Sequence, residues 1–485
     1  MANLDSLLKI IDNEKLQVDK DMVRLAWDFA SAAHNGQVRK NGESYINHPL
    51  ETAITLAKLR LDQDTIVAGL LHDVPEDTSR TLKDITKNFG ADVGNLVEGI
   101  TKLGKLKYRG IERYIENLRK MFVAMAADIR VIFIKFADRL HNLKTLGSLP
   151  VEKQQRIARE TLEIYAPIAN RLGIWQLKGQ LEDLSFKYLY PKEYGALKEQ
   201  IEKNFSERQS MVTSLKTKMW QALTKEQIPV SEISGRSKDL WSLYQKLHKH
   251  NHELQRIHDI VALRIVVPTV ADSYRALGVV HNLWLPMPNR LKDYIAQPKP
   301  NGYRSLHTTI FYDAGKTVEV QIRTPEMHRT AEYGIAAHWL YDEKGSVKLD
   351  KKLDWVQELA KWQTELTDNQ KYLDSLKIDV FQNRIFVFTP KGDVIDLPEN
   401  STPVDFAYHI HSRVGDTATA ARVNNQIAAL DTPLRSGDMV EIITEKKRKG
   451  PNLDWLKFVK TRAAREHIKA NAPKSIWATI TSFRK

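Results

Sequence analysis

The chain has 485 residues, which is long for one hydrophobic core and predicts about three domains. It contains no cysteine, so disulfides, thiolate zinc sites and cysteine nucleophiles are excluded, and a reducing cytoplasm is the expected location. The net charge is +13, and residues 446–485 carry twelve Lys and Arg against two acids, which favours a polyanion partner such as RNA.

The basic end has two other interpretations: a solubilising segment, or the cut end of a longer protein. No apolar run reaches the length of about 20 residues that a membrane helix needs. The N-terminal residues include acids and lack a long apolar core. We therefore expect neither a membrane span nor a signal peptide.

Residues 1–195 are predicted to be helical, because Gly and Pro are sparse and apolar residues recur at helical spacing. His48-Pro49 is expected to open one helix, since proline fits the first turn. Another helix is expected to end in the sequence LLHDVPED, residues 70–77. Farther along, the spacing i, i+4, i+7 places three polar residues on one helix face: Asp138, Asn142 and Thr145.

These helices supply two imidazoles and two carboxylates: His48, His72, Asp73 and Asp138. A donor set without sulfur suits Mn²⁺, Fe or another octahedral metal better than structural zinc. Burying such donors is costly unless a metal or a partner satisfies them, although any single histidine could be a structural core residue. Glu76 and Asp77 are candidates to orient or activate a water that attacks phosphorus.

Three strings around these residues resemble the hydrolase half of the RelA/SpoT family, within the HD phosphohydrolase superfamily: AHNGQVRKNGESYINHP, LLHDVPED and KFADRLHNLKTL. Members of this family make and destroy the alarmone (p)ppGpp. The resemblance implies that the four donors bind Mn²⁺ and that Glu76 and Asp77 serve the attacking water. It also implies that Arg39 stacks on guanine and that the nucleotide pocket is lined by Lys40, Asn142 and Thr145.

Residues from about 150 to 230 are predicted to be connecting helices. A helix that joins two catalytic units and transmits a change between them is one interpretation. A purely structural spacer is the other, and the residues alone do not decide between them.

From Ser231 onward the pattern becomes mixed α/β. The sequence GRSKDLWSLYQKLHK predicts a helix with Arg236 near its start. Four-residue spacing places three phosphate-binding candidates on one face of this helix: Lys238, Ser242 and Lys246. The sequence IHDIVALRIVV predicts a strand, with Asp259 before its apolar run and Arg264 within it.

The stretch 290–323 combines basic side chains, a Pro/Gly loop and an alternating β pattern. Alternation puts Glu319, Gln321 and Arg323 on one strand face, opposite an apolar face. Facing a basic, aromatic loop, that polar face suits a nucleotide, and a solvated outer face is the alternative. Asp259 and Glu319 together are expected to clamp Mg²⁺ on ATP phosphates, without a Walker loop.

Four strings in this region resemble the (p)ppGpp synthetase domain, which is related to the nucleotidyltransferases: HDIVALRIV, PKPNGYRSLHTT, VEVQIRT and EYGIAAHW. The resemblance implies that Arg236 and Arg264 sandwich the adenine of ATP. It implies that Asp259 and Glu319 bind Mg²⁺, with Glu319 also the candidate base for the 3′-hydroxyl. The expected ligands of the ATP phosphates are Lys238, Ser242 and Lys246.

The same resemblance places Tyr303 on the guanine of GDP or GTP as a stacking ring. Asn301, His307 and Gln321 are expected to lie nearby. Arg290 and Lys292 match the basic RxKD form of bifunctional family members, which hints at GDP as the preferred acceptor.

Residues 346–375 are predicted to be a helical linker, and residues 376–445 a compact β-rich module. Within the module, FVFTPKGDVIDLP predicts strand–turn–strand, and TPVDFAYHIH a short helix with Thr402 as its N-cap. The module resembles a TGS domain of β-grasp fold. By resemblance His411 contacts the 3′ end of uncharged tRNA, while a structural histidine is the alternative. Residues 446–485 are predicted to be a basic helical tail that favours RNA contact.

The predicted fold class is therefore multidomain α and α+β. It combines an all-α HD-type phosphohydrolase domain (1–195), a mixed α/β nucleotidyltransferase-like synthetase domain (196–345) and a small β-grasp TGS domain. The expected function is synthesis of (p)ppGpp from ATP and GDP or GTP, and its hydrolysis, with uncharged tRNA and the ribosome as partners. Two rival functions are a hydrolase whose synthetase domain only senses ligands, and a non-enzymatic RNA-binding regulator.

Longer family members continue into a zinc-finger-like region and an ACT domain, and this chain stops before them. A naturally short protein and a trimmed one both fit. Oligomeric state does not follow from the residues.

Overall fold

A computed structural model describes residues 3–104, 111–203, 205–237, 239–249, 261–299, 301–312, 316–338, 356, 384–445, 448 and 450–472. Lys238, Asp259 and nearly all of the expected linker 346–375 lie outside these residues. The chain divides into two compact units, Met1–Glu365 and Leu366–Lys485. Across the described parts, every helix is too short or too polar to cross a membrane. The domain boundaries given above stay predictions.

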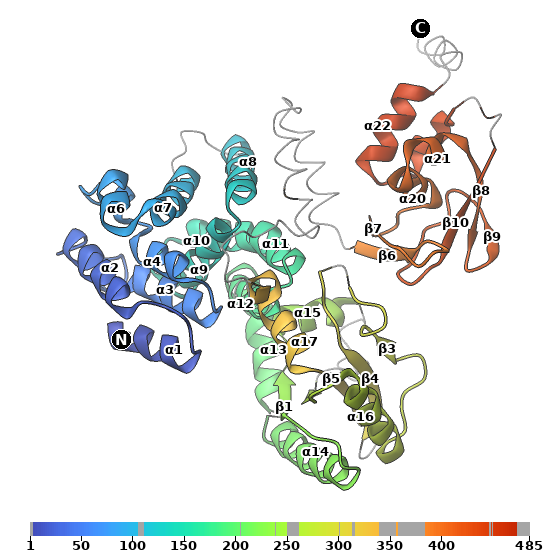
Figure 1. The fold of residues 1–485 in the computed structure, drawn as a ribbon, viewed down its shortest axis with the longest axis horizontal. Helices are drawn as coiled ribbons and strands as arrows, with labels where there is room; N and C mark the ends of the chain where they lie inside the picture. The colour runs from blue at the N-terminus through green and yellow to red at the C-terminus, as the bar shows by residue number, and fades with distance from the viewer. Residues whose placement is uncertain are drawn as a thin grey trace. The chain divides into compact units, whose positions relative to one another are not determined.

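The N-terminal region is helical, as expected (Figure 1). Its helices are α1 Leu4–Asn13, α2 Lys20–Ala33, α3 Asn47–Lys58, α4 Gln63–Leu71, α5 Val74–Asp77, α6 Leu82–Phe89, α7 Ala91–Gly104, α8 Ile111–Ala127 and α9 Arg130–Lys144. Helix α4 is buried from Thr65 to its end, because these residues are mostly apolar on every side, and α3 packs against both α4 and α9. His48 lies in the first turn of α3, as predicted.

The connecting region consists of η1 Leu146–Ser148, α10 Val151–Glu160, η2 Thr161–Tyr165, α11 Ala166–Arg171, α12 Trp175–Leu189, α13 Pro191–Lys203 and α14 Phe205–Lys225. The prediction of connecting helices is therefore confirmed. Between α10 and α11 lies a π-helical turn at Thr161–Tyr165, where the Ala166 N–H donates to Thr161 O, five residues back. Pro167 follows directly and has no N–H with which to continue ordinary helical bonding.

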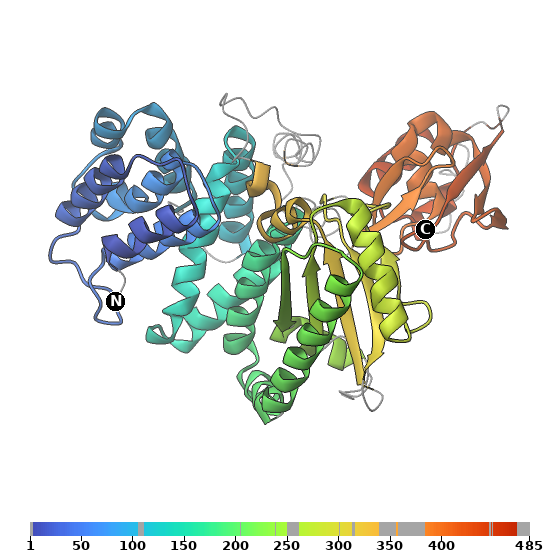
Figure 2. The ribbon, with the colours of Figure 1, turned by 60° about the horizontal axis from the view of Figure 1, so that its bottom comes forward.

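A five-stranded sheet follows, in the order β1-β2-β5-β4-β3. Its strands are β1 Glu232–Ser237, β2 Val261–Val266, β3 Lys292–Asp293, β4 Leu306–Tyr312 and β5 Lys316–Arg323, with α15 Leu240–Lys249 after β1 and α16 Val270–Leu283 after β2. Strands β2 and β5 are parallel, and the other neighbours are antiparallel. Helices α14 and α16 cover one face of this sheet (Figure 2).

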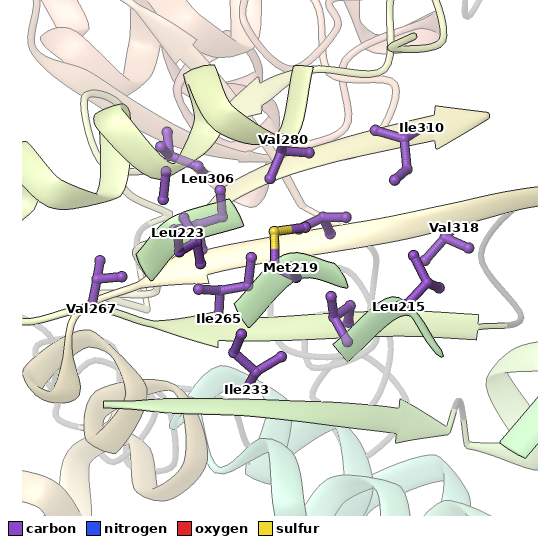
Figure 3. Packing of buried hydrophobic residues seen from close by; sticks show 14 of the residues in the cluster. Leu215, Met219, Leu223, Ile233, Ile265, Val267, Val280, Leu306, Ile310 and Val318 are labelled. Carbon is purple, nitrogen blue, oxygen red and sulfur yellow. The ribbon is translucent and has the colours of Figure 1, made fainter. Parts of the chain in front are cut away.

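The core under these helices comes from alternate strand residues. Val318, Val320 and Ile322 of β5 pack with Leu215 and other residues of α14 in one buried cluster (Figure 3). The predicted alternation of β5 is thus confirmed, and it leaves the opposite face of the sheet for polar side chains.

Helix α17 Pro325–Tyr333 and the 3-10 turn η4 Gly334–His338 return the chain to the connecting helices. The Ile335 N–H donates to Leu172 O at 3.0 Å. Gly334 has φ +57°, and a Cβ built there would lie 2.2 Å from Leu172 O. Backbone therefore touches backbone at this seam, and only glycine fits it.

The second unit holds β6 Arg384–Phe388, β7 Val394–Pro398, α20 Pro403–Ile410, α21 Ser412–Thr417, β8 Ala418–Val423, β9 Gln426–Ala428, β10 Val440–Thr444, η7 Leu453–Lys457 and α22 Arg462–Asn471. Strands β6 and β7 form the predicted hairpin, and Gly392 has φ +88° in its turn. Strands β10-β8-β9 form a second sheet, which a parallel bridge between Phe388 and Met439 links to β6. Thr402 caps α20, as predicted.

The helical residues after the strands share the hydrophobic core of this unit. Trp455 and Ile468 are buried against Val404 and Ala407 of α20. The Asp405 carboxylate is fully buried and accepts five hydrogen bonds. Two come from Thr402, and three come from the backbone and side chain of residues 460–461. One charged group therefore joins α20 to the start of α22.

Candidate active sites

The four residues predicted to bind a metal come together between α3, α4 and α9. Ligand atoms of His48, His72 and Asp138 lie within 4.8 Å of one another, and all three side chains are buried. The Asp73 carboxylate lies 3.2 Å from His72 Nε2 and 3.5 Å from His48 Nε2. Residues up to 90 positions apart in the sequence therefore form one cluster.

The hydrogen bonds of His72 show that this cluster fits a cation. His72 Nδ1 lies 2.9 Å from the Gly69 carbonyl oxygen, which can only accept, so Nδ1 carries the ring proton. His72 Nε2 is buried and makes no hydrogen bond with any described residue. A buried Nε2 beside carboxylate oxygens is stabilised by a positive charge there, either a second ring proton or a divalent metal.

Neighbouring side chains hold both carboxylates ionised. Burial alone would raise the pKa of Asp138, but Lys135 and His48 outweigh it and hold this pKa well below its usual range. Lys135 Nζ lies 2.8 Å from Asp138 Oδ2. Burial likewise opposes ionisation of Asp73, but His72 and His48 lower its pKa. Tyr45 donates to Asp73 at 3.0 Å, and burial raises the pKa of Tyr45, which keeps this donor protonated.

Glu76 and Asp77 lie on the short helix α5, which starts directly after Asp73. Loss of hydration, followed by the charge of Asp73, raises the pKa of Glu76. The Tyr45 hydroxyl lies within hydrogen-bond distance of the Asp77 carboxylate as well as of Asp73, so these two acids compete for its one proton. A carboxylate with a raised pKa, placed beside the donor cluster, is suited to take a proton from water.

Arg39 reaches the end of α9 from a loop more than 100 residues earlier. Its guanidinium donates to Asn142 Oδ1 at 2.6 Å and to Thr145 Oγ1 at 3.4 Å. Three of the four residues expected in the nucleotide pocket are therefore in contact. The fourth, Lys40, has an exposed side chain.

Sequence reasoning missed three residues of this cluster: Tyr45, Lys135 and His141. Lys135 and His141 stand three residues before and after Asp138, so helical spacing alone would have placed them beside it. Tyr45 had no such signal, because it lies in a loop.

In the second region, strand register gathers the predicted residues on the face of the sheet opposite α14 and α16. One row across the strands consists of Ser234, Arg264, Gln321, His307 and Lys292. The next row consists of Arg236, Ala262, Glu319 and Thr309. Residues paired across neighbouring strands share a face, so basic, amide and acidic groups converge there.

Arg236 lies in β1, a few residues before the predicted helix. The helix begins only at Leu240, because the preceding residues pair with β2 as an edge strand. At the start of α15 the Trp241 N–H donates to Asp183 at 2.9 Å, so that amide already has an anionic partner. Ser242 and Lys246 lie on α15, one turn apart.

Glu319 begins a chain of hydrogen-bonded side chains. His307 Nδ1 lies 2.7 Å from Glu319 Oε1, and His307 Nε2 lies 2.7 Å from the Tyr303 hydroxyl. Burial lowers the pKa of His307 despite the nearby Glu319 charge, which favours a neutral ring. A neutral ring in this position donates to the carboxylate and accepts from the phenol. Gln321 also donates to Glu319, at 3.4 Å.

The ring expected to stack on guanine is covered by a connecting helix. Tyr303 is 6% exposed, and its ring packs against Trp175 of α12 with centroids 6.1 Å apart. Lys299 Nζ lies 5.5 Å, 4.7 Å and 5.1 Å from the rings of Trp175, Tyr294 and Tyr303, and burial lowers its pKa to about 8. Stacking by Tyr303 stays a prediction, and it requires this ring to leave Trp175.

Other predicted residues have structural contacts as well. Arg264 and Arg323 share the Glu332 carboxylate, at 3.3 Å and 3.0 Å. The Asn301 side chain lies 3.4 Å from Asn170 O, at the end of α11. Arg290 is exposed in the loop before β3.

In the second unit, His411 is the N-cap residue of α21, and its Nδ1 accepts from the Arg413 N–H at 3.1 Å. Its side chain is exposed, and a contact with RNA stays a prediction.

Comparison with known proteins matches three family models to this chain. They are the HD domain over residues 26–175, the region found in RelA / SpoT proteins over residues 235–346, and the TGS domain over residues 385–444.

Curated relatives match over nearly the whole chain. It is 48% identical over 457 residues to a GTP pyrophosphokinase of Myxococcus xanthus, covering 93% of this chain and 60% of that protein. It is 48% identical over 451 residues to a probable guanosine-3′,5′-bis(diphosphate) 3′-pyrophosphohydrolase of Synechocystis, covering 92% and 59%. It is 45% identical over 473 residues to the bifunctional (p)ppGpp synthase/hydrolase SpoT of Escherichia coli K12, covering 97% and 67%. The chain thus spans about three fifths to two thirds of the length of these relatives.

Proposed function

The chain belongs to the RelA/SpoT family, and on that premise we propose that it both synthesises and hydrolyses (p)ppGpp. The observation that carries the proposal is the presence of two separate polar clusters, each built from the residues that the family resemblance singles out. One is the donor cluster around His48 and Asp138, and the other is the polar sheet face around Glu319.

For hydrolysis, we assign a divalent cation, Mn²⁺, to His48, His72, Asp73 and Asp138. A bound cation of this kind neutralises phosphate charge and makes a water more acidic. Glu76 takes the proton of the attacking water, and the Tyr45 hydroxyl, which lies within hydrogen-bond distance of both Asp73 and Asp77, holds these two carboxylates beside each other. Arg39 is proposed to leave Asn142 and Thr145 and stack on the guanine.

For synthesis, the 3′-hydroxyl of GDP or GTP attacks the β-phosphorus of ATP, and AMP leaves. We assign Mg²⁺ to Glu319 and Asp259, where it neutralises the charge of the transferred pyrophosphoryl group. Glu319 takes the hydroxyl proton, and His307 holds the carboxylate in place by donating to it. Arg236 and Arg264 hold the adenine, while the phosphates bind Lys238, Ser242 and Lys246. The acceptor nucleotide contacts Tyr303, Asn301, Gln321, Arg290 and Lys292.

We further propose that ligand binding at one site inhibits the reaction at the other site. Synthesis and hydrolysis running together would consume ATP without net formation of (p)ppGpp. In support, Tyr303 and Asn301 of the acceptor loop contact Trp175 and Asn170 of the helices that lead from the hydrolase cluster. Saturating ligand at one site should change the kinetics at the other, and unchanged kinetics would remove this part of the proposal.

The TGS domain and the basic residues after it are proposed to contact uncharged tRNA and the ribosome, with His411 at the tRNA 3′ end. The cytoplasm, where these partners are found, is the proposed location.

The test measures two reactions of the purified chain. One contains ATP, GDP and Mg²⁺, and the other contains ppGpp and Mn²⁺. Glu319→Gln should reduce the first by about 100-fold or more and leave the second unchanged, while Asp73→Ala should do the opposite. Glu326→Gln and Asp92→Ala, which change exposed acids outside both clusters, are the matched controls.

If only ppGpp is consumed, even with uncharged tRNA and ribosomes added, the chain is a hydrolase with a silent synthetase domain. If neither reaction proceeds, the RNA-binding alternative takes the place of both.

A further inference from the structure

One nitrogen atom joins the metal cluster to the nucleotide pocket. His141 lies on α9, is 6% exposed, and places its Nδ1 2.7 Å from Nδ1 of His48. The same nitrogen lies 3.2 Å from Nη1 of Arg39. His48 belongs to the donor cluster and Arg39 to the nucleotide pocket, so His141 touches one residue of each.

The protonation of this triplet follows from what each group can donate. A guanidinium has donors only, so His141 Nδ1 must accept from Arg39. Two ring nitrogens 2.7 Å apart share one proton, which therefore belongs to His48 Nδ1. His141 is then neutral with its proton on Nε2.

The consequence for His48 is a fixed orientation. With Nδ1 committed to His141, only Nε2 is left to face the cluster, 3.2 Å from Asp138 Oδ1 and 3.5 Å from Asp73 Oδ2. His72 is fixed in the same sense by the Gly69 carbonyl. Metal-binding histidines usually donate their second N–H to a carboxylate, a backbone carbonyl or a water. Here an imidazole fills that place.

We propose that His141 is a positioning residue whose Nδ1 sets the tautomer of the metal ligand His48 and, until nucleotide binds, holds Arg39, so that the metal and nucleotide sites share a single acceptor. The inference rests on the proposed function for the identity of the two ligands. A histidine buried only for packing would need no acceptor at Nδ1, and a ring of similar size without nitrogen would replace it.

Two variants separate these roles. His141→Phe keeps a ring and removes the acceptor, while His141→Asn places an amide oxygen near the position of Nδ1. The measurement is Mn²⁺ affinity of the full chain without nucleotide, from the electron paramagnetic resonance signal of free Mn²⁺. We expect His141→Phe to weaken binding by about 10–100-fold, the usual effect of losing a partner of a metal ligand, and His141→Asn to restore most of it. Thermal melting checks that both variants are folded.

A second readout needs no variant to be stable. The measurement is a histidine-selective ¹⁵N spectrum of the metal-free wild-type chain. His141 should show the chemical shifts of a neutral imidazole protonated at Nε2, and it should be hydrogen-bonded to His48, which should be protonated at Nδ1. A spectrum in which His141 is protonated at Nδ1 overturns the inference. So does wild-type Mn²⁺ affinity in a folded His141→Phe variant, or equal losses in the Phe and Asn variants.

These failures are distinct from failure of the proposed function. If the wild-type chain binds no Mn²⁺, the metal assignment falls whatever the variants do. If it binds Mn²⁺ and hydrolyses ppGpp but a folded His141→Phe variant keeps the wild-type Mn²⁺ affinity, only the role of His141 is refuted.

Discussion

Replacing Gly334 by alanine should open the seam between η4 and the turn after α11. The added Cβ would lie 2.2 Å from Leu172 O, which is backbone and cannot rotate away. A side chain at φ +57° with ψ −132° costs about 1–3 kcal/mol in strain, and overpacking costs a similar amount. Loss of the bond from Ile335 N–H to Leu172 O adds about 1 kcal/mol. We therefore expect the free energy of unfolding to fall by about 3–7 kcal/mol.

A glycine-to-alanine substitution should have the opposite effect on stability where the added Cβ has room. Gly195 lies inside α13 with nothing within 4 Å of a built Cβ, so Gly195→Ala should stabilise by about 0.5–1 kcal/mol. Denaturant unfolding of the full chain measures both variants, and hydrogen exchange reports on the Ile335 amide. The reasoning is refuted if Gly334→Ala is as stable as wild type, or if its Ile335 amide stays protected.

Two further changes test buried charge. Burial and the charge of Arg323 lower the pKa of His328 to about 4, so the unfolded chain binds this proton more readily than the folded chain and stability should fall as the pH drops from 6.5 towards 4. In denaturant titrations, wild type should lose about 2 kcal/mol more than His328→Asn between pH 7 and pH 4.5. Equal losses in the two proteins would contradict the lowered pKa. Asp405→Asn places an amide N–H₂ against buried donors, and calorimetry of the full chain should show that it lowers the free energy of unfolding of the second unit by about 3 kcal/mol. The control Asp454→Asn, a change at an exposed acid, should lower it by less than about 0.5 kcal/mol. Similar values for the two variants would contradict the role of the buried carboxylate.

Local patterns predicted much of the fold. The alternation of residues 316–323 identified β5 and the face that carries Glu319, because a strand's period fixes which side chains share a face. Proline and threonine signals placed the starts of α3 and α20. Strand β1 before α15 was not predicted, because its residues pair with a strand about 30 positions later, and no local pattern records such pairing.

The clusters were predictable as sets of residues and not as contacts. Spacing on α9 gathered Asp138 with Asn142, but it said nothing about Tyr45, which reaches Asp73 from a loop. Trp175 could not have been linked to Tyr303, since the two are 128 residues apart and meet only through the packing of α12. Contacts between distant elements depend on the whole fold, so one sequence does not reveal them.

The hydrogen bonds of Asp405 also set an order of events during synthesis of the chain. Helix α20 leaves the ribosome with its N-cap bonds available, but three of the five donors to this carboxylate lie 55 or 56 residues later. The apolar face of α20 that packs against Trp455 and Ile468 is uncovered for the same interval. The module therefore completes its fold only after α22 has been translated, and a nascent chain that stalls before that point presents this face to chaperones and proteases.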